Sequence, residues 1–77
     1  MAEKRLNEME KGEKGRVTEI ATSGYLRQRV MDMGVVRGAK IEVVRNAPLG
    51  DLMEFLLKGY NFTLRKEDAA NILLEVE

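Results

Sequence analysis

One segment of this chain has a clear helical period, and the segments around it have the pattern of short β-strands. At about 100° per residue, Leu26, Val30 and Met33 fall on one stripe of a helix. Gly34 follows this stripe, at a position where a left-handed helix cap favours a residue without a Cβ. The sequence therefore predicts a single short helix that ends abruptly at Gly34.

The residues before the helix predict how it starts. Thr22 and Ser23 carry hydroxyls that accept hydrogen bonds from the first free amides of a helix. The strand before them, 16–21, has apolar Val17 and Ile20 three positions apart, so regular alternation would put them on opposite faces. We therefore expect a β-bulge near residues 18–19, which would turn both side chains into one core.

Alternating apolar residues predict further strands after the helix. Pro48 and Gly50 suit a hairpin loop, while Gly38 and Gly59 mark tight turns. Residues 65–70 favour a single helical turn. The strands expected from this pattern cover 16–21, 40–45, 53–57, 60–65 and 71–76.

Five short strands and one helix in 77 residues favour a mainly β fold, because a closed sheet hides edges that would otherwise aggregate. We expect a small, partly open SH3-like barrel, with the helix inserted after the first long strand. Residues 1–5 are small or charged and are expected to be frayed, so 6–77 should form a single domain. A core of this size supplies a net stability of roughly 3 to 5 kcal/mol.

The composition removes most kinds of catalytic and metal site. The chain has no histidine and no cysteine, so the usual general base, reactive thiol and soft metal ligands are missing. The carboxylates lack calcium-loop spacing, and no glycine-rich loop opens a helix. We expect no catalytic residue, no metal ligand and no cofactor.

Charge and hydropathy limit the partners. The 13 basic residues balance the 13 acidic ones, so no nucleic-acid partner is expected. There is no apolar signal segment, and the longest apolar runs are too short to cross a bilayer. The expectation is a cytoplasmic protein without direct membrane insertion. An open barrel edge leaves room for weak homo-oligomers.

Several residues of the helix and the proline loop have no obvious structural task. Leu49 lies at a hairpin tip, and Met31 lies off the helical stripe. Taken singly, each fits an ordinary exposed side chain, but interfaces favour Met and Arg. The sequence thus suggests a partner-binding face made of Arg27, Arg29, Met31, Pro48, Leu49, Gly50 and Asp51, with Gly34, Gly38 and Gly59 as structural turns.

Three motifs in order resemble the FeoA family of ferrous iron transport accessory proteins. They are Arg-Val-Met-Asp-Met-Gly-Val-Val-Arg-Gly at 29–38, Ala-Pro-Leu-Gly-Asp at 47–51, and Gly59 followed by Thr-Leu-Arg-Lys-Glu-Asp-Ala at 63–69. The chain departs from the family pattern at Val30, where leucine is common, and at Arg37 and Leu52, where proline is common. The two missing prolines affect loop rigidity.

The resemblance implies a small SH3-like protein that is not an enzyme. It also implies a partner, the membrane transporter FeoB, whose cytosolic part carries a GTP-binding domain. Alternatives are an SH3-like domain of the iron-dependent regulator type and an RNA-contacting SH3-like module. A ferrous iron carrier, or an activator of GTP hydrolysis through Arg27 or Arg29, is also open.

Overall fold

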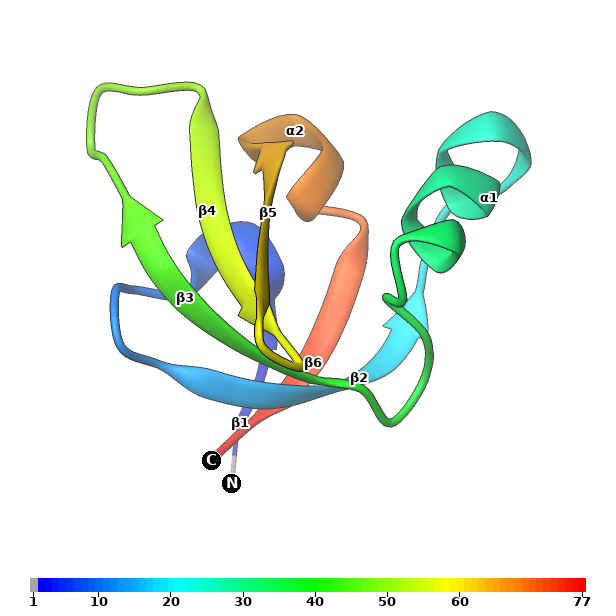
Figure 1. Ribbon diagram of the computed structural model, residues 1–77, viewed down its shortest axis with the longest axis horizontal. Helices are drawn as coiled ribbons and strands as arrows, with labels where there is room; N and C mark the ends of the chain where they lie inside the picture. Colours follow the sequence, from blue (N-terminus) through cyan, green and yellow to red (C-terminus); the bar gives the residue numbers. More distant parts are fainter. Residues whose placement is uncertain (1) are drawn as a thin grey trace.

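The computed structural model describes residues 2–77 as a curled antiparallel sheet with a helix at one end (Figure 1). Strand order across the sheet is β1-β6-β2-β3-β4-β5, which leaves β1 and β5 as the two edges. The elements in chain order are β1 Ala2–Arg5, a 3₁₀ turn η1 Leu6–Glu8, β2 Lys14–Ile20, α1 Gly24–Asp32, β3 Lys40–Asn46, β4 Leu52–Leu57, β5 Tyr60–Arg65, α2 Lys66–Ala69 and β6 Ile72–Val76. The expected mainly β class and the single inserted helix are confirmed, and the helical turn expected over 65–70 is found as α2.

The first strand corrects the sequence prediction. We expected residues 1–5 to be frayed; Met1 lies outside the described residues, and Ala2–Arg5 form β1, paired with β6 from Ala2↔Val76 to Arg5↔Leu73. Backbone hydrogen bonds hold an edge strand without needing apolar side chains, and charged side chains are usual there. The sheet therefore has six strands instead of five.

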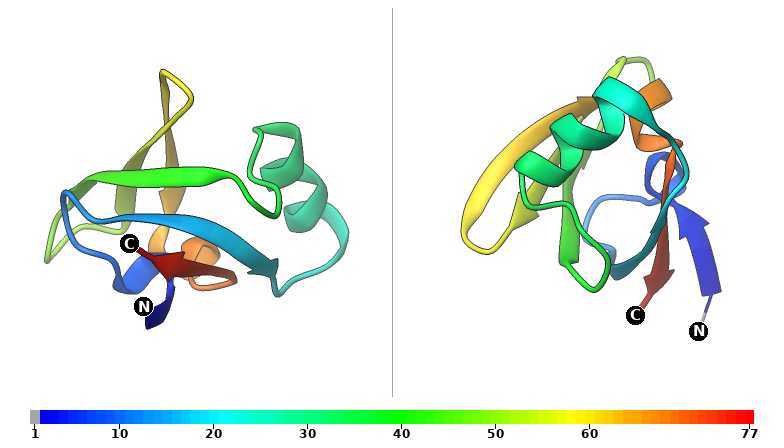
Figure 2. Two further views of the ribbon diagram at one scale, coloured as in Figure 1. Left: turned by 90° about the horizontal axis from the view of Figure 1, so that it is seen from below. Right: turned by 90° about the vertical axis from the view of Figure 1, so that its right-hand side faces the viewer.

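The bulge expected in β2 is confirmed. The pairing of β2 with β6 shifts register between Val17 and Glu19. As a result Val17 and Ile20 are both buried in the core. A second shift, between Val43 and Arg45, occurs where β3 pairs with β4, and the sequence pattern did not predict it. Such shifts bend strands and help the sheet curl around its core (Figure 2).

The core fills the inside of the curled sheet. Phe55 of β4 and Phe62 of β5 pack with ring centroids 5.2 Å apart, and Phe55 is fully buried. Leu6 and Met9 close the core from the N-terminal turn and are also fully buried. The burial of these two residues fixes the chain just after β1, so the edge strand is anchored by packing as well as by pairing.

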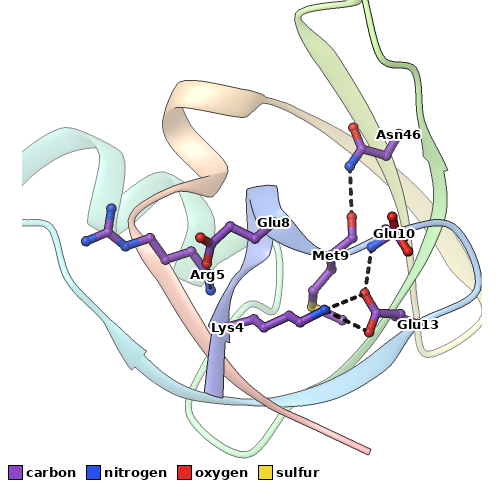
Figure 3. Close-up of polar contacts among 7 residues, drawn as sticks. All are labelled: Lys4, Arg5, Glu8, Met9, Glu10, Glu13 and Asn46. Carbon is purple, nitrogen blue, oxygen red and sulfur yellow. Dashed lines mark hydrogen bonds and ion pairs between the residues drawn. The ribbon is translucent and has the colours of Figure 1, made fainter. Parts of the chain in front are cut away.

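A polar cluster ties the N-terminal turn to the neighbouring strands (Figure 3). The carboxylate of Glu13 accepts a hydrogen bond from the Glu10 backbone amide at 2.8 Å and receives the Lys4 ammonium at 3.2 Å. The Asn46 side-chain amide donates to the Met9 carbonyl oxygen at 2.8 Å. The backbone hydrogen bond, followed by Lys4, holds the pKa of Glu13 below its usual value against a partial opposing effect of burial.

The helix α1 packs on one end of the sheet through the stripe that the sequence predicts. Val30 is buried, and Leu26 and Met33 are partly buried against the core. Ser23 occupies the N-cap position, but its side chain makes no capping hydrogen bond, which corrects the expected cap. Gly24 begins the helix with φ +68, so the first turn is irregular and does not present its amides to the hydroxyl.

Gly34 stops the helix as predicted, with φ +96. A Cβ here would lie 3.1 Å from Leu57 Cδ2 and 3.2 Å from the Tyr60 hydroxyl oxygen. Gly12 has a similar φ of +91 but no atom within 4 Å of a Cβ. The two glycines therefore separate the cost of a left-handed backbone from the cost of close packing.

Gly34→Ala is expected to lower the free energy of unfolding by about 2 kcal/mol, because it adds crowding to backbone strain. Gly12→Ala should lower it by only about 1 kcal/mol, from backbone strain alone. Urea unfolding followed by circular dichroism measures both. Equal losses in the two variants would show that the contact between α1 and the β4–β5 hairpin is loose.

Glu13→Gln is expected to lower the free energy of unfolding at pH 7 by up to about 1 kcal/mol, the scale of a partly exposed ion pair. Because the pKa of Glu13 is lowered in the folded state, its stabilisation is fully present above about pH 6, well above the ordinary glutamate pKa. It disappears as the pH falls through the folded-state pKa. Urea unfolding at a series of pH values should show the free energies of unfolding of the wild type and the variant converging in acid.

The control for this prediction is Glu19→Gln, which changes an exposed residue of β2. A loss as large in this control would contradict the role of the Lys4–Glu13 cluster.

Candidate partner-binding surfaces

The loop between β3 and β4 presents an apolar tip on an anchored base. Leu49 is fully exposed, with 101% relative accessibility, and Leu52 is 56% exposed. Lys66 of α2 holds the base, since its ammonium donates to the Ala47 carbonyl oxygen at 2.6 Å and its backbone amide to that of Asp51 at 2.7 Å. The tip is therefore positioned by α2 while its leucine points into solvent.

The loop between β3 and β4 also borders a shallow groove of about 470 Å³. Gly50 donates its amide to the Ala47 carbonyl oxygen at 3.2 Å, which closes the turn beneath Leu49. The groove is lined by Arg45, Ala47, Gly50, Asp51, Leu52, Met53, Glu54 and Thr63. We call Pro48, Leu49 and Leu52 the loop tip. It is the structure's most exposed apolar feature among residues 2–77.

The residues predicted on α1 divide between two sides of the helix. At about 100° per residue, Arg27 and Met31 lie at one edge of the buried stripe, and Arg29 lies at the other edge with Tyr25. Arg27 already uses part of its hydrogen-bonding capacity within the fold, since its guanidinium donates to the Ile20 carbonyl oxygen at 3.0 Å. Tyr25 is 80% exposed, although no sequence pattern marked it as a candidate contact.

A second groove, of about 550 Å³, runs between α1 and the end of β2. Its lining contains Arg27 and Met31 but not Arg29. Val36 adds exposed apolar surface from the segment after the helix. Of the three residues predicted on α1, therefore, two line this groove and Arg29 does not.

The helix and the loop tip do not form one continuous face. Figure 1 and the left view of Figure 2 place α1 and the β3–β4 loop at opposite ends of the molecule. Seven residues of β3 connect the two ends, and an extended chain advances about 3.3 Å per residue. The strand β3 thus divides the predicted residues between two patches at opposite ends (Figure 1), and their role in binding a partner stays a prediction.

A third surface is a groove of about 650 Å³ with a basic lining, which no sequence pattern predicted. Its cations come from the starts of β2 and β3, from the segment before β3, and from the β4–β5 turn. The net charge of zero gave no sign of this clustering. Strand register would have been needed, because Arg16 meets Lys40 only through the pairing of β2 with β3.

The described part of the chain offers no evident site for a metal ion. Within residues 2–77, no three histidine, cysteine, aspartate or glutamate residues cluster so as to hold one. Over the same residues, no helix has the length and apolarity needed to span a bilayer. The surfaces that distinguish the molecule are the apolar loop tip with its shallow groove and the two larger grooves.

The curled six-stranded antiparallel sheet with one inserted helix defines the class of the protein as a small SH3-like domain. The fold is similar to a zinc-complexed FeoA from Stenotrophomonas maltophilia that is described as a prokaryotic SH3 domain protein, with a TM-score of 0.80. That similarity covers 91% of this chain and 87% of the other at 19% identity, so it concerns the fold alone. The expected SH3-like architecture is confirmed.

The chain belongs to the FeoA domain family, whose pattern it matches over residues 4–76. A FeoA-like protein from Clostridium acetobutylicum is 41% identical, with a TM-score of 0.86 over 99% of this chain and 88% of that one. A Porphyromonas gingivalis (strain ATCC BAA-308 / W83) protein, an Fe(2+) transport protein A/Fe(2+) transporter FeoB fusion, is 39% identical over 72 residues. Those residues are 94% of this chain but only 8% of the fusion protein. The resemblance found in the sequence is thus confirmed.

Proposed function

We propose that this chain is a non-enzymatic accessory protein that binds the cytosolic part of a FeoB-type ferrous iron transporter. The observation that carries the proposal is the Porphyromonas gingivalis fusion, in which a segment similar to this chain and a FeoB transporter share one polypeptide. Fusion keeps two parts at high effective concentration, which is useful when the parts act together. The chain covers 8% of that protein, so transport itself belongs to the remainder.

Of the two patches into which the predicted face divides, the loop tip is the better docking surface. A fully exposed leucine keeps its whole apolar side chain in water, which is unfavourable in the free protein. It therefore gains most free energy from entering an apolar pocket. Because Lys66 fixes both ends of the loop base, little chain entropy is lost on binding. In the groove beside α1, Arg27 already donates to the Ile20 carbonyl oxygen of β2, which leaves this arginine less available to a partner.

Binding would alter transport only if the protein favours one state of the transporter. A ligand shifts an equilibrium between two states by its difference in affinity for them. The cytosolic GTP-binding domain that the family resemblance implies provides two such states. We therefore propose that the loop tip binds the nucleotide-bound and nucleotide-free forms with different affinity, and so modulates assembly or activity.

Calorimetric titration into the full-length, detergent-solubilised FeoB-type transporter of the same organism tests this proposal. Leu49→Ser is expected to weaken binding at least about tenfold, which corresponds to about 1.4 kcal/mol. Its free energy of unfolding should stay within about 0.5 kcal/mol of the wild type, because the side chain packs on nothing. Titrations with and without a non-hydrolysable GTP analogue should give different affinities.

Met31→Ser is the matched control on the other apolar surface. It replaces an exposed apolar side chain at the α1 end and should leave the affinity within about twofold. Wild-type protein that binds neither nucleotide state would contradict the proposed function. A loss confined to Met31→Ser would instead assign docking to the groove beside α1.

A further inference from the structure

Five of the chain's 13 basic residues line one groove, although the net charge is zero. Glu42 is the acidic residue among its lining side chains. All five cations are exposed: Lys14, Arg16, Arg37, Lys40 and Lys58. We call this surface the basic groove. It differs from the loop tip in position, since the β3–β4 loop and the β4–β5 turn lie at opposite ends of β4 (Figure 1).

Few of these charges are compensated within the protein. Lys40 pairs with the Glu77 side chain at 3.1 Å, and Arg16 donates to the Gly38 carbonyl oxygen at 3.2 Å. The ion pairs formed within residues 2–77 do not include Lys14, Arg37 or Lys58. The Lys40–Glu77 pair shows that the rim can hold a carboxylate at bonding distance, while the remaining cations are available to a ligand.

The middle of the groove is not built for a compact anion. The backbone amides of Gly38 and Ala39 donate to the carbonyl oxygens of Val17 and Val36, at 2.7 and 3.0 Å. They therefore cannot form the nest of free amides that typically holds phosphate. Val36 and Leu56 add apolar surface between the charged side chains. This combination suits a ligand with several separated carboxylates and some apolar groups.

The backbone of the β4–β5 turn points to a role for the side chain of Lys58. Lys58 and Gly59 have φ of +48 and +86, as in a type I′ turn. Asn-Gly is the preferred pair in such turns, and a residue like lysine is strained with positive φ. Strain of this kind is concentrated at functional positions. Here it presents a cation at the rim of the basic groove.

We infer that the basic groove binds an acidic, partly apolar peptide segment of a partner protein. Complementary charge draws such a segment to the rim, and Val36 and Leu56 contact its apolar side chains. A membrane surface fits less well, because the site is concave and the most exposed apolar side chains, Leu49 and Tyr25, lie outside its lining. The inference does not depend on docking through the loop tip.

Fluorescence polarisation with a labelled synthetic peptide of alternating Glu and Leu tests the inference on the full chain. Saturable binding is expected that weakens as salt rises and is absent for a Lys-Leu peptide of the same length. Lys58→Asn should weaken binding about threefold, and Lys58→Asn with Arg37→Gln about tenfold, because each removes one rim charge. Asparagine suits the turn, so thermal unfolding should show no loss of stability in Lys58→Asn.

Lys11→Asn is the control, since it removes one exposed positive charge outside the groove. It should leave the peptide affinity unchanged. An equal loss in this control, or no binding of the acidic peptide, would overturn the inference. So would displacement of the peptide by inorganic phosphate at constant ionic strength. Sedimentation with phosphatidylglycerol vesicles in the absence of peptide binding would also overturn it and would assign the groove to a membrane surface.

Discussion

The pairing of the last strand, β6, between β1 and β2 is the constraint on which the rest of the structure depends. Residues from the two ends of the chain meet there, from Ala2↔Val76 to Ile20↔Ile72. The bulge in β2 occurs within this pairing and turns Val17 and Ile20 into the core. The same pairing sets where β2 ends, and so where α1 begins. Without cysteine to cross-link them, the chain ends are held by backbone hydrogen bonds and packing.

This arrangement also positions the surfaces. The helical turn α2 leads directly into β6, and through Lys66 it grips the base of the β3–β4 loop. Pairing of β2 with β3 brings Arg16 beside Lys40, and the β4–β5 turn adds Lys58. The apolar loop tip and the basic groove thus occupy opposite ends of β4. A domain built this way can offer two chemically different contacts to its surroundings.

Much of the fold could be predicted because its signals are local. The helical stripe ended by Gly34, the β2 bulge and the alternation in β4 and β5 all follow from neighbouring residues. β1 could not be found this way, because its charged sequence resembles a frayed end and its partner lies some seventy positions along the chain. The surfaces were harder still. Leu49 could be singled out at its hairpin tip, and the predicted strand 40–45 already separates it from the helix. The clustering of cations could not be predicted, because it depends on strand register, which no local pattern contains.

We propose that this member of the FeoA family docks on a FeoB-type transporter through the loop tip. Amide hydrogen exchange of the full chain, with and without the full-length transporter, tests it most directly because protection is read along the whole backbone. The account predicts that the transporter slows exchange mainly at residues 47–52. Unchanged exchange throughout the chain, or protection confined to α1 and the segment after it, would contradict it.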